Sequence, residues 1–468
     1  MPQLDAILST IDGNLEAALE RWFGLLRIPS VSTDPAHKED CQRAARYMAE
    51  MLSDMGLEAS VRETPGHPMV VAHAKADDPG APRYLFYGHY DVQPADPLEE
   101  WNTPPFEPVM VTGEDGEKRI FARGADDDKG QLLTFIEALR AHIEASGGQP
   151  LNLTILLEGE EESGSPSLDA FLRENADELR ADMALVCDIP QWDAETPAIT
   201  TRLRGMMHDE AIITGPRADL HSGLYGGPAH NPNHIVARLI AGLWDEDGRV
   251  TLEGFYDGVP ALPESLRKAW AELGMTDEKF MAEIGLRPPC AGEKGYSALE
   301  KVWARPTIEV NGMAGGYTGP GAKTVIPSRA FFKISCRLVG DQDPFRIREA
   351  FRAYVRANVP DGVQVAFSEE GGASPAVQVP EDSPAIRAAA RCLAEEWGRQ
   401  PVMMGSGGSI PVVRSFKDIL GMDSLLIGFG LNEDAIHSPN EKYDLRSFHK
   451  GMRSWARIIA ALGEGAQD

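Results

Sequence analysis

The sequence predicts an α/β fold, a mostly parallel sheet sandwiched by helices, with a smaller α+β domain inserted into it. Three observations lead to this class. Short apolar runs alternate with helical patterns over about the first 200 residues, dense glycine and proline with more two-sided strands follow to about residue 385, and the first pattern then returns. Apolar strands that alternate with helices are typical of a parallel sheet covered on both faces. A chain of 468 residues has room for two or three domains.

The first part of the chain is expected to begin with helices and to continue with buried strands. Apolar residues recur at the spacing of an amphipathic helix at Leu15, Leu19, Trp22 and Leu26, and a second helix covers about 39–56. Apolar runs predict four strands, at 69–72, 84–87, 153–157 and 183–186. Between the second and third strands, a helix carries on one face Leu132, Ile136, Leu139 and Ile143.

The inserted domain is expected over residues 204–382, interrupting a domain made of residues 1–203 and 383–468. The elements predicted in the insert are a helix at 232–244, a strand at 331–335 and a helix at 344–357. After the insert come a helix, a strand at 424–427 and a last helix with four apolar residues in register, Phe448, Met452, Trp455 and Ile459.

The chain is strongly acidic, with 45 Lys and Arg against 72 Asp and Glu and a formal net charge of −27 at pH 7. This charge repels phosphate backbones and anionic membranes, so we expect neither a nucleic-acid nor a membrane partner. No run approaches the ~20 apolar residues of a membrane span, and the N-terminus does not resemble a signal peptide. The five cysteines are odd in number and widely spaced, which favours reduced thiols in a cytoplasmic protein.

Polar clusters follow the predicted strands or open the helix between them. They are His89 with Asp91, 123–130, 158–164, Asp188 and 437–440. The carboxyl ends of parallel strands meet at one edge of an open sheet, where functional crevices lie. Two histidines and several carboxylates converging there suit one or two divalent ions of zinc or manganese type.

Each cluster also has a purely structural interpretation. A lone His89 suits a hydrogen-bonded core position, 126–128 suits a solvated helix N-terminus, and 160–162 suits a solvated charge run. Asp188 suits a turn or helix cap. Their joint placement at strand ends, with glycines that permit close backbone approach, favours a metal site. The His-Asp-Glu run at 208–210 is not expected to be one, because adjacent residues of a strand face opposite sides.

Seven segments carry a resemblance to a known family. In chain order they are 88–94 (GHYDVQP), 123–130 (RGADDDKG), 158–165 (EGEEESGS), 219–227 (DLHSGLYGG), 321–327 (GAKTVIP), 407–411 (GGSIP) and 437–442 (HSPNEK). The chain resembles the co-catalytic, two-metal metallopeptidases that include carboxypeptidase G, aminoacylase, succinyl-diaminopimelate desuccinylase and the carnosine dipeptidases. Its motifs are most similar to those of the cytosolic non-specific dipeptidase and carnosinase branch.

The resemblance implies two divalent metal ions per subunit, with zinc expected and manganese as the alternative. The implied ligands are His89 and Asp188 for one ion, Glu162 and His437 for the other, and Asp127 between them. Asp127 is assigned from the pattern Asp-Asp-Lys-Gly, so a slip of one residue to Asp126 stays open. Asp126 and Glu160 are extra acids of these motifs and are expected to lie partly at the solvated surface.

The resemblance also implies the catalytic residues. Asp91 would orient His89. Glu161, the general base, would take a proton from a water shared by the two ions, and the metal-bridged hydroxide left behind would attack the peptide carbonyl. The implied substrate-binding residues are His221, Thr324, Arg337 and Ser409. His221 would stabilise the oxyanion from the partner subunit of a homodimer built through the insert, which would also serve as a lid.

The expected function is that of a metal-dependent dipeptidase. Asp188 favours this, because family members with Asp at this position resemble dipeptidases and aminopeptidases, whereas those with Glu resemble carboxypeptidases, acylases and desuccinylases. One alternative is an N-acyl-amino-acid hydrolase or carboxypeptidase acting at the same site. Another is a non-catalytic peptide- or metal-binding protein descended from such enzymes, which the intact ligand set disfavours.

Overall fold

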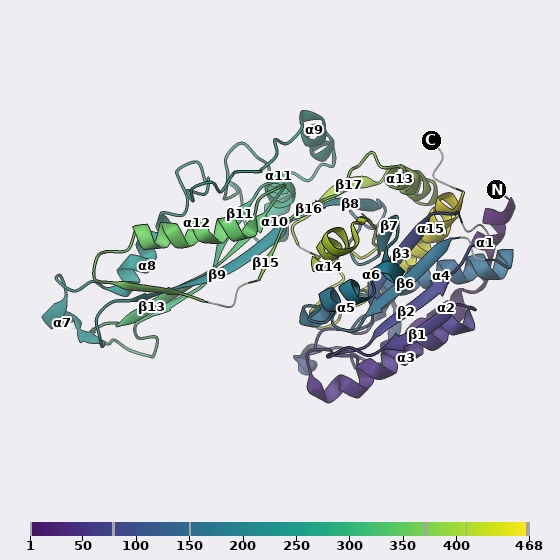
Figure 1. Ribbon diagram of the computed structural model, residues 1–468, viewed down its shortest axis with the longest axis horizontal. Coiled ribbons are helices and arrows are strands. Elements are labelled where there is room, and N and C mark those ends of the chain that lie inside the picture. Colours follow the sequence, from purple (N-terminus) through teal and green to yellow (C-terminus); the bar gives the residue numbers. More distant parts are fainter. Residues whose placement is uncertain (1, 77–79, 149–150, 369–371, 409, 465–468) are drawn as a thin grey trace. The chain divides into compact units, whose positions relative to one another are not determined.

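The computed structural model describes residues 2–76, 80–148, 151–368, 372–408 and 410–464 (Figure 1). The described residues form two compact units. Unit 1 lies within Met1–Thr201, Val379–Met404 and Ser415–Asp468, and unit 2 within Arg202–Gln378 and Gly405–Arg414. The sequence predicts borders at 203/204 and 382/383 and places 405–414 in the interrupted domain, whereas this segment groups with unit 2.

Unit 1 is built on a mixed sheet whose centre is parallel. The strand order is β1-β2-β6-β3-β7-β18-β8-β16, and β17 (Val402–Ser406) pairs with β8. The central strands run parallel to one another: β6 (Asn152–Glu158), β3 (Arg83–His89), β7 (Met183–Val186) and β18 (Asp423–Leu426). Antiparallel neighbours flank them: β1 (Glu58–Arg62), β2 (Met69–Ala74) and β8 (Ala198–Leu203). The last two residues of β8 belong to unit 2 and pair there with β16 (Val377–Gln378).

The helices of unit 1 come from the beginning, middle and end of the chain. The longer ones are α1 (Pro2–Gly13), α2 (Leu15–Leu26), α3 (Lys38–Asp54), α4 (Lys129–Ser146), α13 (Pro384–Trp397) and α15 (Leu445–Gly463). The shorter ones are η1 (Pro35–His37), η2 (Leu98–Glu100), η3 (Glu161–Ser163), α5 (Leu168–Glu174), α6 (Ala176–Leu179) and η4 (Phe416–Leu420). α14 (Pro411–Ser415) lies at the border with unit 2.

Helices cover both faces of this sheet. Successive side chains of a strand point to opposite faces, so the neighbours Phe86 and Tyr87 of β3 contact different helices. On one face, Phe86 of β3 stacks on Phe135 of α4 with ring centroids 3.8 Å apart. Trp455 of α15 packs edge-on against Phe135 at 5.2 Å and against Phe86 at 6.4 Å, so α15 lies beside α4 on the same face (Figure 1). On the other face, Tyr87 meets Phe416 of η4 at 5.6 Å. The α/β class predicted from the sequence is confirmed.

A small second sheet in unit 1 joins distant segments. Its order is β19 (Lys442–Asp444), β5 (Lys118–Phe121) and β4 (Val109–Thr112), all antiparallel. The backbone N–H of Ala122 donates to the carbonyl of Glu441 at 3.2 Å, which extends the pairing of β5 and β19. This sheet therefore fixes the segment that carries His437 against the segment that opens α4.

Unit 2 is an α+β unit built on a five-stranded antiparallel sheet. Its strands are β11 (Thr307–Gly315), β13 (Arg329–Leu338), β9 (Gly205–Thr214) and β14 (Gln364–Phe367) in that order, with β15 (Ala373–Ser374) also on β9. Residues along β9 alternate between buried and partly exposed, so one face of the sheet forms a core. That face is covered by α8 (Pro232–Ala241) and α12 (Pro344–Ala357) (Figure 1). The remaining elements are β10 (Leu220–His221), α7 (Ser222–Tyr225), α9 (Glu264–Glu272), α10 (Asp277–Glu283), α11 (Ala298–Ala304) and β12 (Val325–Ile326).

The helices and strands predicted from the sequence are all present, with borders moved by a few residues. The helix predicted at 232–244, for example, ends at Ala241. The sequence did not predict α1, the edge strand β1 or the small sheet of β4, β5 and β19, and it also missed the strands β8 and β17 and the short helices α5, α6, α9, α10 and α11.

Candidate metal centre

Three neighbouring strands deliver the first side chains of the site. His89 is the last residue of β3 and lies opposite Glu158, the last residue of β6. Asp188 follows the end of β7, which pairs with the other edge of β3. Because these strands are parallel, their carboxyl ends meet at one edge of the sheet.

Two groups of metal-ligand side chains lie at this edge. In the first, His89 Nε2 lies 3.1 Å from Asp127 Oδ1 and 3.8 Å from Asp188 Oδ2. In the second, His437 Nε2 lies 2.9 Å from Asp127 Oδ2 and 3.3 Å from Glu162 Oε2. Within each group, the ligand atoms all lie within 4.8 Å of one another. Asp127 belongs to both groups and turns one oxygen toward each histidine.

The neighbouring Asp126 belongs to neither group. Its side chain packs so closely on Gly430 that a Cβ there would lie 2.5 Å from Asp126 Oδ2. Burial and the nearby carboxylates of Asp434 and Glu441 raise the pKa of Asp126 well above its ordinary value. The geometry therefore favours Asp127 over Asp126 as the residue shared by two ions.

The extra acids Asp126 and Glu160 are both buried, so the expectation of a partly solvated position is wrong for each. They are 3% and 2% exposed. Glu160 accepts hydrogen bonds from the backbone N–H groups of His67 at 2.9 Å and Ser167 at 3.1 Å. Its carboxylate thus ties together loops beside the site, which explains why an acid in a charge run is buried.

The charges in both groups suit a cation. The pKa of His437 rises to about 10 because hydrogen bonds to Asp127 and Glu162 stabilise its charged ring. Burial favours the neutral ring of His89, but Asp127 and Asp91 outweigh burial and hold its pKa well above the ordinary value. Carboxylates that stabilise a histidine cation also stabilise a metal cation, and imidazole with carboxylate is a donor set that zinc and manganese accept. The residues present therefore fit two divalent ions.

Asp91 is buried below the site and holds the turn that carries the glutamates. Its carboxylate accepts from the backbone N–H groups of Glu161 at 3.3 Å and Glu162 at 3.1 Å. His89 Nδ1 lies 3.1 Å from the carbonyl oxygen of Asp91 and 3.4 Å from its Oδ1. Asp91 thus fixes the His89 ring chiefly through its backbone, and the 161–162 turn through its side chain.

Glu161 lies beside both groups without belonging to either. Burial raises its pKa to about 7, and the carboxylates of Asp127, Asp91 and Glu162 act in the same direction, against the opposite effect of His89. A carboxylate with a pKa near neutrality is suited to taking up a proton and giving it back.

Two further residues support the candidate ligands and were not singled out from the sequence. Gln93 Nε2 donates to Glu162 Oε2 at 2.7 Å, and the backbone N–H of His89 donates to Asp128 Oδ2 at 3.0 Å. Both lie inside motifs that carry the family resemblance, so position in a motif was the available signal. Partners of this kind orient metal ligands and tune their basicity.

The substrate-binding residues implied by the resemblance lie outside unit 1. His221 ends β10 and is exposed; its Nδ1 accepts from the N–H of Gly223 at 3.0 Å, which leaves the hydrogen of a neutral ring on Nε2. Thr324 precedes β12, the partner of β10, and its carbonyl accepts from Ser222 N at 3.1 Å. The structure thus brings His221 and Thr324 close together, because His221 pairs with Val325, the residue after Thr324.

Arg337 and Ser409 complete the set of predicted site residues. Arg337 is half-buried on β13, opposite Met206 of β9, and burial lowers the pKa of its guanidinium. Ser409 lies outside the residues that the structure describes.

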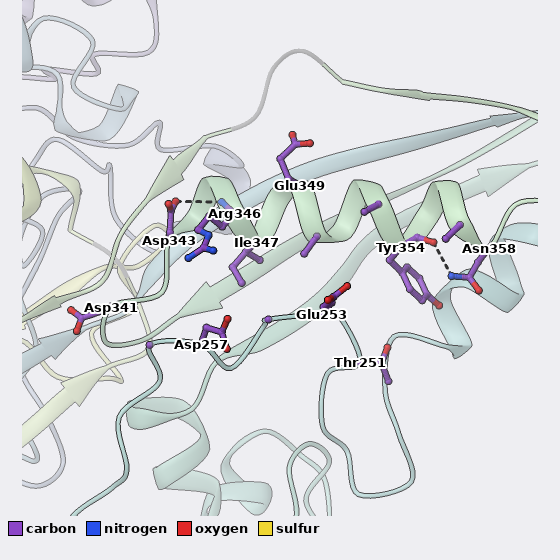
Figure 2. Close-up of a pocket in the computed structure, with 15 residues that line it drawn as sticks. Thr251, Glu253, Asp257, Asp341, Asp343, Arg346, Ile347, Glu349, Tyr354 and Asn358 are labelled. Carbon is purple, nitrogen blue, oxygen red and sulfur yellow. Dashed lines mark hydrogen bonds between the residues drawn. The ribbon is translucent and has the colours of Figure 1, made fainter.

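Unit 2 also contains a separate groove of about 860 Å³ beside α12 (Figure 2). The charged residues that line it are Glu253, Asp257, Asp341, Asp343, Arg346 and Glu349. Asp343 serves as the N-cap of α12, since its side chain accepts from the N–H of Phe345 at 2.8 Å. No predicted site residue and no histidine lines this groove, so the catalytic chemistry is better placed at the sheet edge of unit 1.

An α/β domain that gathers two histidine–carboxylate groups around one aspartate has the architecture of a metal-dependent hydrolase. Comparison with known families identifies the family. The model of peptidase family M20/M25/M40 matches residues 85–461, and the chain belongs to that family. The resemblance inferred from the motifs is confirmed.

Relatives match over almost the whole chain. The Cys-Gly metallodipeptidase DUG1 of Saccharomyces cerevisiae is 30% identical, covering 99% of both chains, and the human Beta-Ala-His dipeptidase is 27% identical, covering 95% of this chain and 89% of the relative. The crystal structure of human carnosine dipeptidase 1 matches with a TM-score of 0.80 at 25% identity, covering 98% and 99% of the two chains. The metallo-carboxypeptidase Sso-CP2 of Sulfolobus solfataricus also matches with a TM-score of 0.80, at 30% identity and 96% and 99% coverage. Among the described residues, no helix combines the length and the apolar character that crossing a membrane requires.

Proposed function

We propose that the protein is a metal-dependent dipeptidase that uses two divalent ions. The observation that carries the proposal is that Asp127 is shared by two ligand groups, with Glu161 beside both. The relatives that match over nearly the full chain and are named for dipeptides support the substrate class.

Five side chains would hold the two ions. The proposed ligands are His89 and Asp188 for one ion, Glu162 and His437 for the other, and Asp127 for both. When bound, two adjacent divalent ions lower the pKa of a shared water and polarise the peptide carbonyl. Zinc is the expected metal and manganese the alternative, since both accept imidazole with carboxylate.

Glu161 would act as the general base and then as the general acid. It would take a proton from the attacking water and give it to the nitrogen of the leaving amine. Its burial and its carboxylate neighbours support this role, because they bring its pKa to about 7. Asp91 would keep Glu161 in place by accepting its backbone N–H at 3.3 Å.

Residues of unit 2 would bind the substrate, and one of them, His221, would come from a second copy of the chain. The Nε2–H of His221 would donate to the oxyanion from the partner subunit of a homodimer, with unit 2 as dimerisation domain and lid. Leu224 and Tyr225 follow His221 on α7 and are 74% and 48% exposed, which suits an interface beside it. Arg337 and Thr324 would hold the substrate carboxylate, and Ser409 would line the same pocket.

A cytoplasmic location goes with this proposal. The five cysteines are free thiols, four of them buried, which suits a reducing compartment. The expected partners are a dipeptide substrate and a second copy of the chain, with no nucleic acid and no membrane.

A panel of peptides run with zinc and with manganese tests the function. We expect release of amino acids from dipeptides with free amino termini, and rates at least about tenfold lower for the same dipeptides N-acylated. Higher rates on N-acylated substrates would favour the alternative, an N-acyl-amino-acid hydrolase or carboxypeptidase. The similarity to the metallo-carboxypeptidase Sso-CP2 is the observation that favours this alternative. A purified protein without bound transition metal that gains no activity from added metal would be a binding protein instead.

A further inference from the structure

Glu441 is a buried carboxylate next to the ligand groups but in neither of them. It is fully buried and lies four residues after the proposed ligand His437 in the motif HSPNEK. Nothing in the mechanism above uses it, and its position in that motif suggested no role from the sequence.

The carboxylate of Glu441 receives the backbone of the loop that carries Asp127. Its Oε1 accepts from the N–H groups of Asp126 at 2.9 Å and Asp127 at 3.1 Å. Its Oε2 accepts from the N–H of Gly124 at 2.8 Å and from Arg123 Nη1 at 2.7 Å. Four donors of one short loop therefore converge on one side chain.

Arg123 holds Glu441 in turn. The guanidinium is buried, donates through Nη2 to the carbonyl of Pro94 at 3.1 Å and lies 5.5 Å from the ring centroid of Trp101. Removing one partner of a buried ion pair strongly destabilises the fold, because the other charge is left buried and unpaired. The pair therefore keeps Arg123 and Glu441 in contact. The Asp127 loop is thus anchored to the segment that carries His437.

We propose that Glu441 is the positioning residue of the metal centre, which holds the Asp127 loop so that this carboxylate lies between the two histidines before any ion binds. The inference rests on the ligand set proposed above. Its consequence is that Glu441 raises the affinity for both ions, because Asp127 is the ligand that they share.

The variant Glu441→Gln tests this with little change in shape. An amide has only one acceptor oxygen, so in either orientation its NH₂ group meets N–H donors of the loop. We expect the apparent dissociation constant for zinc, measured by competition with a chromophoric chelator, to rise about 10–100-fold, the usual effect of losing a partner of a ligand.

Glu137→Gln is the matched control. Glu137 is also a buried glutamate of unit 1 held by an arginine, accepting from Arg21 Nε at 2.7 Å and Nη2 at 2.6 Å, but it contacts no ligand loop. We expect its zinc affinity to remain that of the parent. Equal affinity of Glu441→Gln and the parent would overturn the inference alone, whereas a parent chain that binds no divalent ion would overturn the proposed function.

Hydrogen exchange on the parent chain gives a second test that needs no variant. In chelator-treated full-length protein, a peptide over 122–128 should exchange at least about tenfold more slowly than the exposed turn at 113–117, because three of its amides, those of Gly124, Asp126 and Asp127, donate to the Glu441 carboxylate. Equal exchange of the two segments would show that the loop is not held in advance, and would overturn the inference even if Glu441→Gln failed to fold.

Discussion

Asp126 and Asp127 are neighbours in the chain with opposite electrostatic surroundings. Burial and nearby acids favour the neutral form of Asp126. Burial acts the same way on Asp127, but hydrogen bonds to His437 and His89 outweigh it and hold the pKa below the ordinary value. An asparagine at position 126 therefore resembles the neutral form that Asp126 already favours. An asparagine at position 127 removes the negative charge that would bind the metal ions.

We accordingly expect Asp127→Asn to lose most bound metal and Asp126→Asn to retain it. Elemental analysis after gel filtration would measure metal per chain, and circular dichroism would check that both variants are folded. Loss of metal from Asp126→Asn with retention in Asp127→Asn would mean that the bridging residue is Asp126, the slip of register that the sequence leaves open.

We expect a substitution at Glu161 to lower catalysis while metal binding stays unchanged. Because it belongs to neither ligand group, Glu161→Gln should bind the same metal as the parent while kcat falls by about 10²–10⁴-fold, the usual contribution of a general base. The KM for the dipeptide should change little. Activity close to that of the parent in the metal-loaded variant would exclude Glu161 as the base.

The pH dependence of the parent enzyme follows from the same residue. A base must be unprotonated, and burial with neighbouring acids raises the pKa of Glu161 to about 7. Bound cations favour the carboxylate and lower this pKa, so kcat/KM should fall on the acid side with a midpoint at or below about pH 7. A rate that stays constant down to about pH 4, with metal content unchanged, would contradict this.

At the scale of elements, the end of β6 holds a buried glutamate that links stability to pH. Burial raises the pKa of Glu158 to about 8, against the opposite effect of the hydrogen bond that Tyr87 donates to it at 2.7 Å. Folding thus favours protonated Glu158. The stability that comes from this group is complete below its unfolded pKa and is lost as the pH rises through about 8.

Glu158→Gln is neutral at every pH and retains an oxygen for Tyr87. We expect its free energy of unfolding, relative to that of the parent, to increase from about pH 5 to about pH 9. Urea unfolding in the presence of chelator measures this without bound metal. A difference between variant and parent that is independent of pH would contradict the raised pKa.

How far the elements were predictable depends on their burial. β3, β6 and β7 are apolar runs because both faces are covered, and the sequence predicted them. β4 and β5 form a local hairpin, but β4 is mostly exposed, so it carries no comparable apolar run. β19 is only three residues long and joins this hairpin through long-range pairing with β5, which no local pattern predicts. That sheet nevertheless helps to place His437 near the start of α4, a convergence that the sequence predicted from the placement of the polar clusters and not from these strands.

At the scale of the whole molecule, the convergence of the candidate ligand residues was predictable because each lies in a motif that follows a strand or opens α4. The supporting contacts were not. Arg123 and Glu441 are 318 positions apart in the sequence, and no local pattern pairs them. Burial of Asp126 and Glu160 likewise depends on loops contributed by other parts of unit 1.

If each catalytic site takes residues from both chains of a homodimer, a dimer of two different variants can test this. In the proposed homodimer, each site takes Glu161 from one chain and His221 from the other. Glu161→Gln and His221→Ala should each be nearly inactive alone. A heterodimer of the two contains one site with both native residues and one with neither, so it should regain about half of the parent activity.

Co-expression of the two variants with different affinity tags, followed by purification through both tags, isolates that heterodimer. The control pairs the Glu161→Gln chain with a chain that carries both substitutions, because neither site of that dimer has a native Glu161. Activity restored in the first pair and absent from the control requires that His221 act across the interface. A monomeric protein, or a heterodimer as inactive as its parents, would place His221 in its own chain's site or outside catalysis, and the exposed Leu224 and Tyr225 would then need another explanation.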